Sequence, residues 1–559
     1  MPAGFPLGIK ITGPAGLGIN STAEVIASLS ANLGYEVITD IEYESRIKGG
    51  SNYFDIFIAP NRKYLSKKVD IILSFDAKSL DYNIHTLKNN GVIIINQKFR
   101  EKINTETYKT IESKNIQILD LKITDKYDNT YLLGILSKLL SIPHQAINNE
   151  LQAVFGKKGA DIVEKNKEII KKISHSYTID FDYAIHLKNI GDAKNIEYGN
   201  KMLAHGAIEC GLEYYSAYPM TPASTILSEI IASKKVNYLQ AEDEISVINS
   251  ALGASFTGAR SMVGTSGGGF ALMTEAVSFA VQAEFPITIV FSQRAGPSTG
   301  TPTFFEQGDL NFALNPTFGD FDHIVLYPST LEEAYYFGGL ALNLADKYQT
   351  QVIILMDKQS SELNGTLGKL NVPEIERGVI LNNPPQDYKR YELTDTGVSP
   401  RVHVGTKNGD FIASSYEHDE YGATSEDPKV KVAMTQKRFK KLENFYKKEN
   451  ISGYEIINSE AKKMIITTSF TSYTANEFIK NNSEFGLITI TILKPLDERL
   501  LEEIKNKKEV IFVESNYSGQ LENYITKEFG LKYIKGLKIS NLRKYDLFPF
   551  YIEDFNELI

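Results

Sequence analysis

The chain has 559 residues, of which 42% are hydrophobic and 23% charged, values typical of a globular protein with several domains. The formal net charge of −9 excludes a general attraction to nucleic acid or to an anionic membrane surface. No apolar run approaches the roughly 20 residues of a membrane helix, and the N-terminus lacks the pattern of a signal peptide. A cytoplasmic protein that uses neither membrane nor nucleic acid is therefore expected.

A single cysteine, Cys210, limits the cofactors that the chain could hold by itself. One thiol cannot form a disulfide within the chain, and structural zinc sites are built from several Cys and His residues. Iron–sulfur clusters are usually held by about four cysteines. We therefore predict neither a metal centre nor a cluster on this chain.

The N-terminal segment has the pattern of a strand, a glycine loop and a helix. The strand is predicted over Leu7–Thr12 and the loop GPAGLG runs from Gly13 to Gly18. Ser21 and Glu24 predict a capping box before a helix that ends at Gly34. Apolar strands alternate with helices beyond this point, which indicates a parallel α/β sheet. The further strands are predicted at YEVITDI, VDIILSF, GVIIINQ and IQILDLKI, before a helical stretch over residues 130–174.

Two more α/β segments follow. The second segment contains the strands PITIVFS and VIILMD, and the last contains MIITTSF, LITITIL and EVIFVES. Between them the composition turns to Pro, Gly, Asp and His, which is typical of a long ordered linker. The predicted fold is α/β with three consecutive doubly wound domains. The first spans residues 1–180, the second 195–380, the linker region 381–455 and the third 456–559.

The loop from Gly13 to Gly18 is a candidate phosphate site, because it would present backbone N–H groups and a helix N-terminus to an anion. Its glycines match the pattern G-x-x-x-x-G-K-[ST], but Ile19 and Asn20 stand where Lys and Ser/Thr are required. The spacing of Gly13, Gly16 and Gly18 does not fit the pattern G-x-G-x-x-G either. A tight turn without a ligand and a phosphate-binding loop both stay open.

The second segment contains four motifs with functional potential. In AYPMTPAS, Thr221 is predicted to cap a helix that begins at Pro222, a start that suits a small carboxylate. The helix after Glu244 is apolar nearly all round and is predicted to be buried. A carboxylate at the start of a buried helix is poorly solvated, which favours its protonated form and suits a group that shares a proton. A plain capped helix and a dipole-favoured acid are the structural alternatives.

The other two motifs follow predicted strands. Three glycines, Gly267 to Gly269, come after Thr265 and Ser266 and indicate close approach by backbone or ligand, or a flexible turn. Arg294 follows the strand PITIVFS and is the only cation between Pro286 and His323. Ligands of open α/β sheets bind beyond the carboxyl ends of strands, and an arginine fork pairs with a carboxylate. A structural role for this arginine is the alternative.

Together these segments resemble the α subunit of the 2-oxoacid:ferredoxin oxidoreductases. AYPMTPAS resembles that family's Y-P-I-T-P-[AS]-[ST] motif, with Met220 in place of Ile. QRAGPSTG and EQGD resemble its Q-R-G-G-P-S-T-G and E-Q-G-D segments, with Ala295 in place of a Gly, and Gly268 replaces a Pro in a TSGPG-like loop. The first 180 or so residues resemble the family's γ subunit, fused here ahead of α.

The resemblance implies a fold and a set of site residues. The central domain would be of the type that binds the pyrimidine of thiamine diphosphate, and the last domain would be transketolase C-terminal-like. Glu244 would be the catalytic residue, bonded to the aminopyrimidine N1′, while Thr221 and Arg294 would bind the 2-oxoacid. The other implied cofactor contacts are Tyr218, Pro219, Thr265, Ser266 and Gly267.

The resemblance also implies a partner, because this sequence lacks the G-D-G segment with which thiamine enzymes hold diphosphate and Mg²⁺. That segment, Mg²⁺ and a [4Fe–4S] cluster would be on a separate β subunit, so the expected enzyme is a heterodimer. It would convert a 2-oxoacid such as pyruvate or 2-oxoglutarate, with coenzyme A, to acyl-CoA and CO₂, with ferredoxin as electron acceptor. Gly13, Gly16 and Gly18 are the candidate coenzyme A loop. A nucleotide- or CoA-binding ligase subunit and a non-catalytic assembly subunit are the alternatives.

Overall fold

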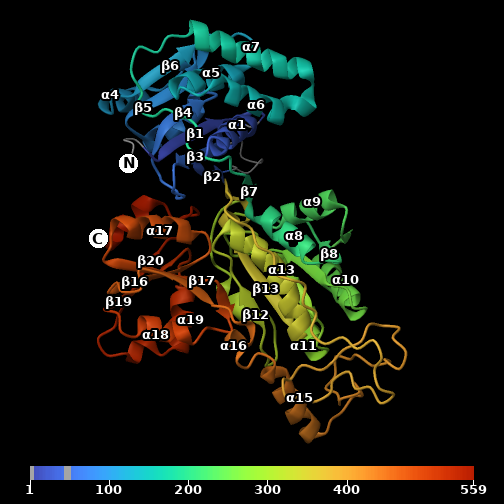
Figure 1. The fold of residues 1–559 in the computed structure, drawn as a ribbon. Coiled ribbons are helices and arrows are strands. Elements are labelled where there is room, and N and C mark those ends of the chain that lie inside the picture. Colours follow the sequence, from blue (N-terminus) through green and yellow to red (C-terminus); the bar gives the residue numbers. More distant parts are fainter. Residues whose placement is uncertain (1–4, 15, 43–51) are drawn as a thin grey trace. The chain divides into compact units, whose positions relative to one another are not determined.

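The computed structural model describes residues 5–14, 16–42 and 52–559, so that Ala15 of the predicted glycine loop lies outside the described residues. The chain forms two compact units, each described here by itself (Figure 1). The first comprises residues 1–197, 363–368 and 551–559, and the second comprises residues 198–362 and 369–550. Among the described residues, no helix combines the length and apolar character needed to cross a membrane.

The first unit contains an eight-stranded sheet with the order β6-β5-β4-β1-β3-β2-β14-β7. Its strands are β1 (Leu7–Gly13), β2 (Glu36–Glu42), β3 (Asn52–Ala59), β4 (Val69–Ser74), β5 (Leu87–Asn96), β6 (Gln117–Leu121), β7 (Ile196–Tyr198) and β14 (Asn364–Thr366). β1, β4, β5 and β6 are parallel neighbours, whereas β3 is antiparallel to both β1 and β2. The sequence patterns missed β3, so the sheet is mixed where a parallel one was predicted.

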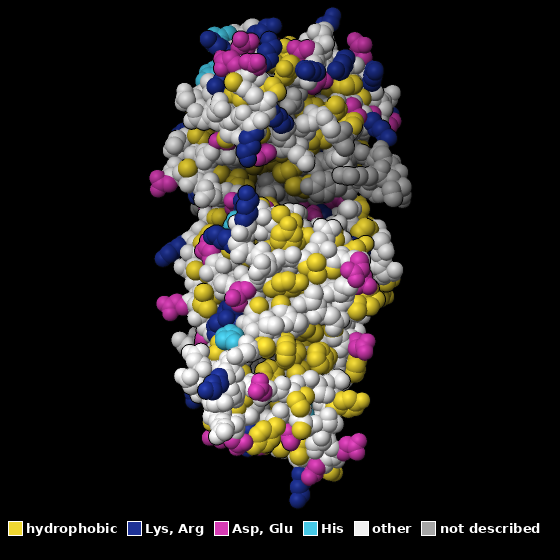
Figure 2. All heavy atoms as spheres, turned by 90° about the vertical axis from the view of Figure 1, so that its right-hand side faces the viewer, with side chains coloured by type: hydrophobic (Ala, Val, Ile, Leu, Met, Phe, Trp, Pro, Cys, Tyr) yellow, Lys and Arg dark blue, Asp and Glu magenta, His cyan; other side chains and the backbone are white. Residues whose placement is uncertain are grey.

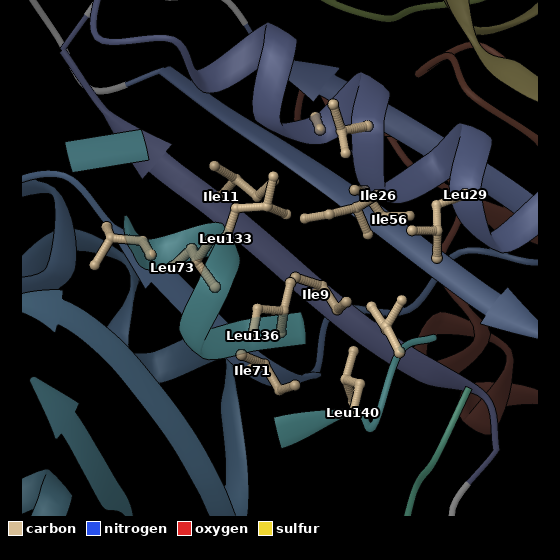
Figure 3. Close-up of a cluster of buried hydrophobic side chains, with 14 of the residues drawn as sticks. Ile9, Ile11, Ile26, Leu29, Ile56, Ile71, Leu73, Leu133, Leu136 and Leu140 are labelled. Carbon is tan, nitrogen blue, oxygen red and sulfur yellow. The ribbon is translucent and has the colours of Figure 1, made fainter. Parts of the chain in front are cut away.

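Helices cover this sheet and complete its core. They are α1 (Ile19–Asn32), α2 (Ala77–Asn83), α3 (Gln97–Arg100), α4 (Thr105–Ser113), α5 (Asp128–Leu139), α6 (His144–Phe155) and α7 (Ala160–Ser176). Figure 3 shows Ile9 and Ile11 of β1 next to Leu133 and Leu136 of α5, in a cluster where all four side chains are at most 3% exposed. All seven residues of β1 are buried, as a central strand covered on both faces requires.

The predicted capping box of the first helix is wrong. The helix begins at Ile19, with Gly18 as its N-cap and no side-chain cap, so that Ser21 lies inside the first turn. The Ser21 hydroxyl donates to the Gly18 carbonyl at 3.1 Å instead of capping an N–H group. The earlier start is allowed because Gly18 has a φ of +86°, a backbone conformation that other residues rarely adopt.

The second unit contains two sheets. The seven-stranded sheet has the order β18-β12-β13-β11-β10-β8-β9, and the five-stranded sheet has the order β15-β17-β16-β19-β20. Among the described strands of these sheets, β18 pairs antiparallel with β12 and β15 with β17, and the other neighbouring strands are parallel. The strands are β8 (Tyr214–Ala217), β9 (Asn237–Gln240), β10 (Ser261–Thr265), β11 (Ile287–Gln293), β12 (Ile324–Leu326), β13 (Gln351–Asp357), β15 (Tyr454–Ile457), β16 (Lys463–Thr468), β17 (Phe485–Ile490), β18 (Ile492–Lys494), β19 (Glu509–Glu514) and β20 (Lys538–Arg543).

The two sheets of the second unit share one hydrophobic core. Phe291 of β11 and Ile353 of β13 belong to the same buried cluster as Ile466 of β16 and Phe512 of β19. β18 follows β17 directly in sequence but pairs with β12 of the other sheet. The helices are α8 (Gly199–Glu209), α9 (Ser224–Ser233), α10 (Glu244–Phe256), α11 (Gly267–Gln282), α12 (Leu310–Leu314), α13 (Leu331–Tyr348), α14 (Lys358–Glu362), α15 (Pro428–Lys440), α16 (Phe445–Glu449), α17 (Thr471–Asn481), α18 (Arg499–Ile504) and α19 (Gln520–Glu528).

Buried ion pairs fix the long segment between β14 and β15, which has few regular elements. Asp346 of α13 pairs with Arg377 and Arg401 of this segment and with Arg260. Glu284 pairs with Lys437 of α15 and with Lys441, and all three side chains are almost completely buried. The segment is therefore an ordered covering of the domain, held by charge as well as by apolar contact.

Candidate active site

The predicted site residues of the second unit lie at one edge of its seven-stranded sheet. Tyr218 to Thr221 follow β8, Ser266 to Gly269 follow β10, and Arg294 follows β11. These three strands are parallel, so their carboxyl ends meet at the same edge. Ligands of open α/β sheets bind at this edge, because loops and helix N-termini converge there.

Glu244 is the first residue of α10. Asp243 is the N-cap, and its side chain accepts a hydrogen bond from the Ser246 N–H at 2.8 Å. Glu244 is only 5% exposed, because the helix that it begins buries one face in the core. The prediction of a buried helix holds for that face alone, since Ile245 and Phe256 are 51% and 37% exposed. Among the described residues, no group makes a hydrogen bond or ion pair with its carboxylate. A buried carboxylate in this position is available to a ligand.

The Glu244 carboxylate lies against the start of α11. A Cβ at Gly269 would come within 2.6 Å of Glu244 Oε1 and 2.3 Å of Thr265 Oγ1. A Cβ at Gly267 would come within 2.9 Å of Asp309 Oδ2. The close approach of neighbouring side chains to the backbone therefore explains why two of the three positions are glycine. A Cβ at Gly268, by contrast, would meet no atom within 4 Å.

Ser266 is the N-cap of α11 but makes no side-chain cap hydrogen bond. It is 0% exposed, and its Oγ has no hydrogen-bond partner in the described part of the chain. Buried polar atoms are nearly always hydrogen-bonded, so an unpaired buried hydroxyl at this edge of the sheet is a candidate contact for a ligand. With the Glu244 carboxylate, the Ser266 hydroxyl fits a polar ring that both donates and accepts hydrogen bonds, as an aminopyrimidine does.

Arg294 is half-buried beside Thr221. Its Nη1 donates to the Thr221 carbonyl at 2.9 Å. Burial lowers the pKa of the Arg294 guanidinium, and the Asp309 carboxylate opposes that effect. Burial and Glu306 raise the pKa of Asp309 to about 6, against the influence of Arg294. Cation and carboxylate are thus electrostatically coupled at the mouth of the site.

Thr221 does not cap a helix, contrary to the prediction. α9 begins at Ser224 with Ala223 as its N-cap, and the peptide bond before Pro222 is cis. The Pro222 carbonyl accepts a hydrogen bond from the Asn200 side chain at 2.8 Å, so it is held outside the helix. Thr221 nevertheless lies at the predicted site, next to Arg294.

Tyr218 and Pro219 lie at the exposed rim of the site, where Tyr218 is 41% exposed. Thr265 and Ser266 are fully buried below them. The structure thus places Glu244 and Thr265 around Gly269, and Arg294 against Thr221. Among the described residues, no group of three or more His, Cys, Asp or Glu side chains could hold a metal ion.

Sequence reasoning missed the polar network beneath Arg294. Gln293 Oε1 accepts from the Asp309 N–H at 2.8 Å, and Gln293 Nε2 donates to the Tyr327 hydroxyl at 3.1 Å. The Tyr327 hydroxyl and Gln307 Nε2 both donate to the Asp357 carboxylate. The EQGD segment was identified by resemblance alone. The only signal in the sequence that Asp309 belongs to the site is its place in the loop after β11.

The glycine loop belongs to the first unit. Gly16 and Gly18 have φ values of +90° and +86°, which explains both glycines by backbone conformation. A Cβ at Gly13 would come within 2.7 Å of Phe75. The loop therefore has structural reasons for its glycines, and the helix start after Gly18 has no side-chain cap.

Two family models match the chain. One, described as pyruvate ferredoxin/flavodoxin oxidoreductase, matches residues 8–175. The other, described as the thiamine diphosphate-binding part of pyruvate flavodoxin/ferredoxin oxidoreductase, matches residues 205–437 and so contains the whole site around Glu244. Fold, site and models define a subunit of a thiamine diphosphate-type oxidoreductase.

Individual relatives narrow the class. The 2-oxoacid:ferredoxin oxidoreductase subunit alpha of Saccharolobus solfataricus is 30% identical over 93% of this chain and 93% of its own length. The 2-oxoglutarate synthase subunit KorA of Methanocaldococcus jannaschii is 32% identical over 56% of this chain and 86% of its own. The chain belongs to the α subunits of the 2-oxoacid:ferredoxin oxidoreductases, as its motifs predicted.

A solved structure agrees with this assignment over the whole chain. The 2-oxoglutarate:ferredoxin oxidoreductase from Magnetococcus marinus, with 2-oxoglutarate, coenzyme A and succinyl-CoA bound, has a TM-score of 0.88 and 29% identity. The match covers 99% of this chain and 98% of that one. The predicted α/β fold class is thereby confirmed.

Proposed function

We propose that this chain supplies the pyrimidine half of a shared active site that oxidatively decarboxylates a 2-oxoacid. The products would be acyl-CoA and CO₂, with ferredoxin as electron acceptor, in the cytoplasm. One observation carries the proposal: Glu244 is buried, has no partner among the described residues, and lies against Gly269 at the start of α11.

Glu244 would hold a proton at N1′ of the aminopyrimidine ring. Thiamine diphosphate, when bound, supplies the carbanion chemistry of such reactions, while the protein tunes its electronic state. The position of Glu244 suits this role, because its carboxylate is buried and has no other partner among the described residues. Thr265, Ser266 and Gly267 would line the ring below, with Tyr218 and Pro219 at the rim.

Arg294 and Thr221 would bind the 2-oxoacid. A guanidinium and a carboxylate form a charge-assisted, two-pronged hydrogen-bond pair, which fixes the substrate in orientation as well as in place. The hydrogen bond to the Thr221 carbonyl leaves other guanidinium donors of Arg294 free to make that pair. The relatives named above act on 2-oxoacids, and 2-oxoglutarate and pyruvate are the substrates to test first.

A β subunit would complete the site with Mg²⁺, the diphosphate contacts and a [4Fe–4S] cluster. The chain has one cysteine, Cys210, which is buried, and lacks a G-D-G segment, so these functions need a second chain. Figure 2 shows apolar atoms gathered on one face of the second unit. Exposed apolar side chains also lie in the segments on either side of Glu244 and at the start of α11. They include Tyr238, Leu239, Ile245 and Leu272. Such surfaces mark protein–protein contacts.

Coenzyme A would use the loop with Gly13, Gly16 and Gly18 through one of its phosphates. Support comes from the start of α1, where the N-cap Gly18 has no side-chain cap and the N–H groups of the first turn remain available to an anion. Asn129 of α5 lies beside Gly18 and offers a further donor. The positive φ values of Gly16 and Gly18 are compatible with this role.

Co-expression with the candidate β subunit tests the proposal. The purified complex should reduce a low-potential dye only when both a 2-oxoacid and coenzyme A are present, and the α chain alone should be inactive. A stable, thiamine-loaded complex that oxidises no 2-oxoacid would contradict the proposed reaction. Activity of the α chain by itself would contradict the shared site.

A further inference from the structure

A turn of the seven-stranded domain is held by a side chain of the five-stranded one. Gln520 is the first residue of α19, next to β19. Its Nε2 donates to the Gly308 carbonyl at 2.6 Å, and its Oε1 accepts from the Asn311 N–H at 2.8 Å. One side-chain amide thus contacts the backbone on both sides of Asp309.

Gln520 is itself fixed by the loop that precedes it. Asn516 Oδ1 accepts from the N–H groups of Gly519 and Gln520, and Asn516 Nδ2 donates to the Gln307 carbonyl. Gln307 and Ser515 also exchange two hydrogen bonds, at 2.7 and 3.0 Å. The clamp is therefore a built contact with several fixed members, and it is not the chance position of one side chain.

The clamped turn leads to the proposed substrate arginine. The Asp309 N–H donates to Gln293, the residue before Arg294, and the Asp309 carboxylate is electrostatically coupled to Arg294. Arg294 in turn donates to the Thr221 carbonyl. A shift of the turn would move the negative charge that faces the guanidinium, and with it the preferred position of Arg294.

We propose that Gln520 is a positioning residue for the 2-oxoacid site, acting through Asp309 on Arg294. The five-stranded domain then has a part in substrate binding through this clamp. This inference rests on the proposed function of Arg294. A positioning role can be told from a purely structural one, because loss of the clamp should weaken substrate binding without slowing the turnover of bound substrate.

The test compares Gln520→Ala with Asn523→Ala in the complex with the β subunit. Asn523 lies on the same helix and is exposed, and its side chain donates to the Ser518 carbonyl without contacting the turn. Gln520→Ala should raise the KM for the 2-oxoacid about fivefold and change kcat by less than about twofold. The KM for coenzyme A should not change. Asn523→Ala should leave all three constants unchanged.

A double variant separates positioning from general loosening. In an Arg294→Ala background, Gln520→Ala should not lower kcat/KM further, since both changes act on the same contact. An unchanged KM in Gln520→Ala, or an equal loss with and without Arg294, would overturn the inference alone. A wild-type complex that oxidises no 2-oxoacid would overturn the proposed function and this inference together.

Discussion

The carboxylate of Glu244 lies so close to Gly269 that a Cβ at position 269 would come within 2.6 Å of Glu244 Oε1. The two residues come from the starts of different helices, α10 and α11. This contact fixes where the carboxylate can lie, and it connects the glycine motif to the proposed catalytic residue.

Gly269→Ala should therefore displace Glu244 and lower activity by at least about tenfold, since small displacements of catalytic groups are costly. Gly268→Ala is the matched control, because its Cβ would meet no atom within 4 Å. Alanine also favours helix over glycine, so the control should be no less stable than the wild type. Dye-reduction rates and melting temperatures of both variants check this. Equal activities of the two variants would contradict the role of the contact.

Much of this site could be predicted from local sequence. Apolar runs predicted β11 and β13, and the parallel order of β8, β10 and β11 makes their following loops neighbours. The start of the helix after Thr221 could not be predicted, because the Pro222 carbonyl is held by Asn200, a contact between distant residues. The contact of Gln520 with this turn could not be predicted for the same reason, since 212 residues separate Gln520 from Gly308.

In the first unit, local patterns gave the position of α1 but not its start. Ser21 and Glu24 have the spacing of a capping box, yet the N-cap is Gly18, three residues before the Ser21 that the box requires. The sequence pattern also missed β3, whose antiparallel pairing depends on contacts with β1 and β2. The roles proposed for the glycine loop and for each site residue stay predictions.

Glu244→Gln should keep the fold and remove most activity, about 100-fold or more, because a neutral amide cannot share a proton with a ring nitrogen in the same way. Glu242→Gln is the control, since Glu242 is exposed two residues earlier on the same segment. Single-turnover rates with saturating thiamine diphosphate check the prediction. Near-normal turnover by Glu244→Gln would remove this residue from the chemistry.

Arg294→Ala should raise the KM for the 2-oxoacid about 10- to 100-fold, the effect of losing a charge-assisted hydrogen-bond pair. Arg294→Lys should recover part of the loss, because it restores the charge but not the two-pronged geometry. Steady-state kinetics over a range of 2-oxoacid concentrations measure both effects. If the KM stays at its wild-type value in Arg294→Ala, the substrate carboxylate binds elsewhere.

Asp309 predicts a pH dependence of stability. Its pKa is raised to about 6, above the ordinary value of 3.8, so protonation stabilises the folded chain. That contribution is complete below about pH 4 and is lost as the pH rises through about 6. Asp309→Asn should therefore melt a few degrees above the wild type near neutral pH, with a much smaller difference near pH 4.5. Asp320→Asn, in an exposed loop, should show no such trend. A constant difference at all pH values would contradict the assignment.

Glu284 predicts the opposite dependence for the segment that covers the second unit. Burial alone would raise the pKa of Glu284, but Lys437, Lys441 and Arg390 outweigh it and hold that pKa well below its usual range. Its contribution to stability is therefore present above the ordinary pKa of about 4.5 and is lost as the pH falls further below it.

Glu284→Gln would leave Lys437 and Lys441 buried without their shared carboxylate. Breaking a buried pair in this way typically costs about 3–5 kcal/mol, so the denaturant midpoint should fall clearly at neutral pH. Proteases should also cut residues 381–427 sooner, because α15 and its lysines anchor the C-terminal end of that segment. Glu443→Gln, exposed just after Lys441, is the control and should behave like the wild type. Unchanged stability and unchanged proteolysis in Glu284→Gln would mean that apolar contacts alone hold the segment in place.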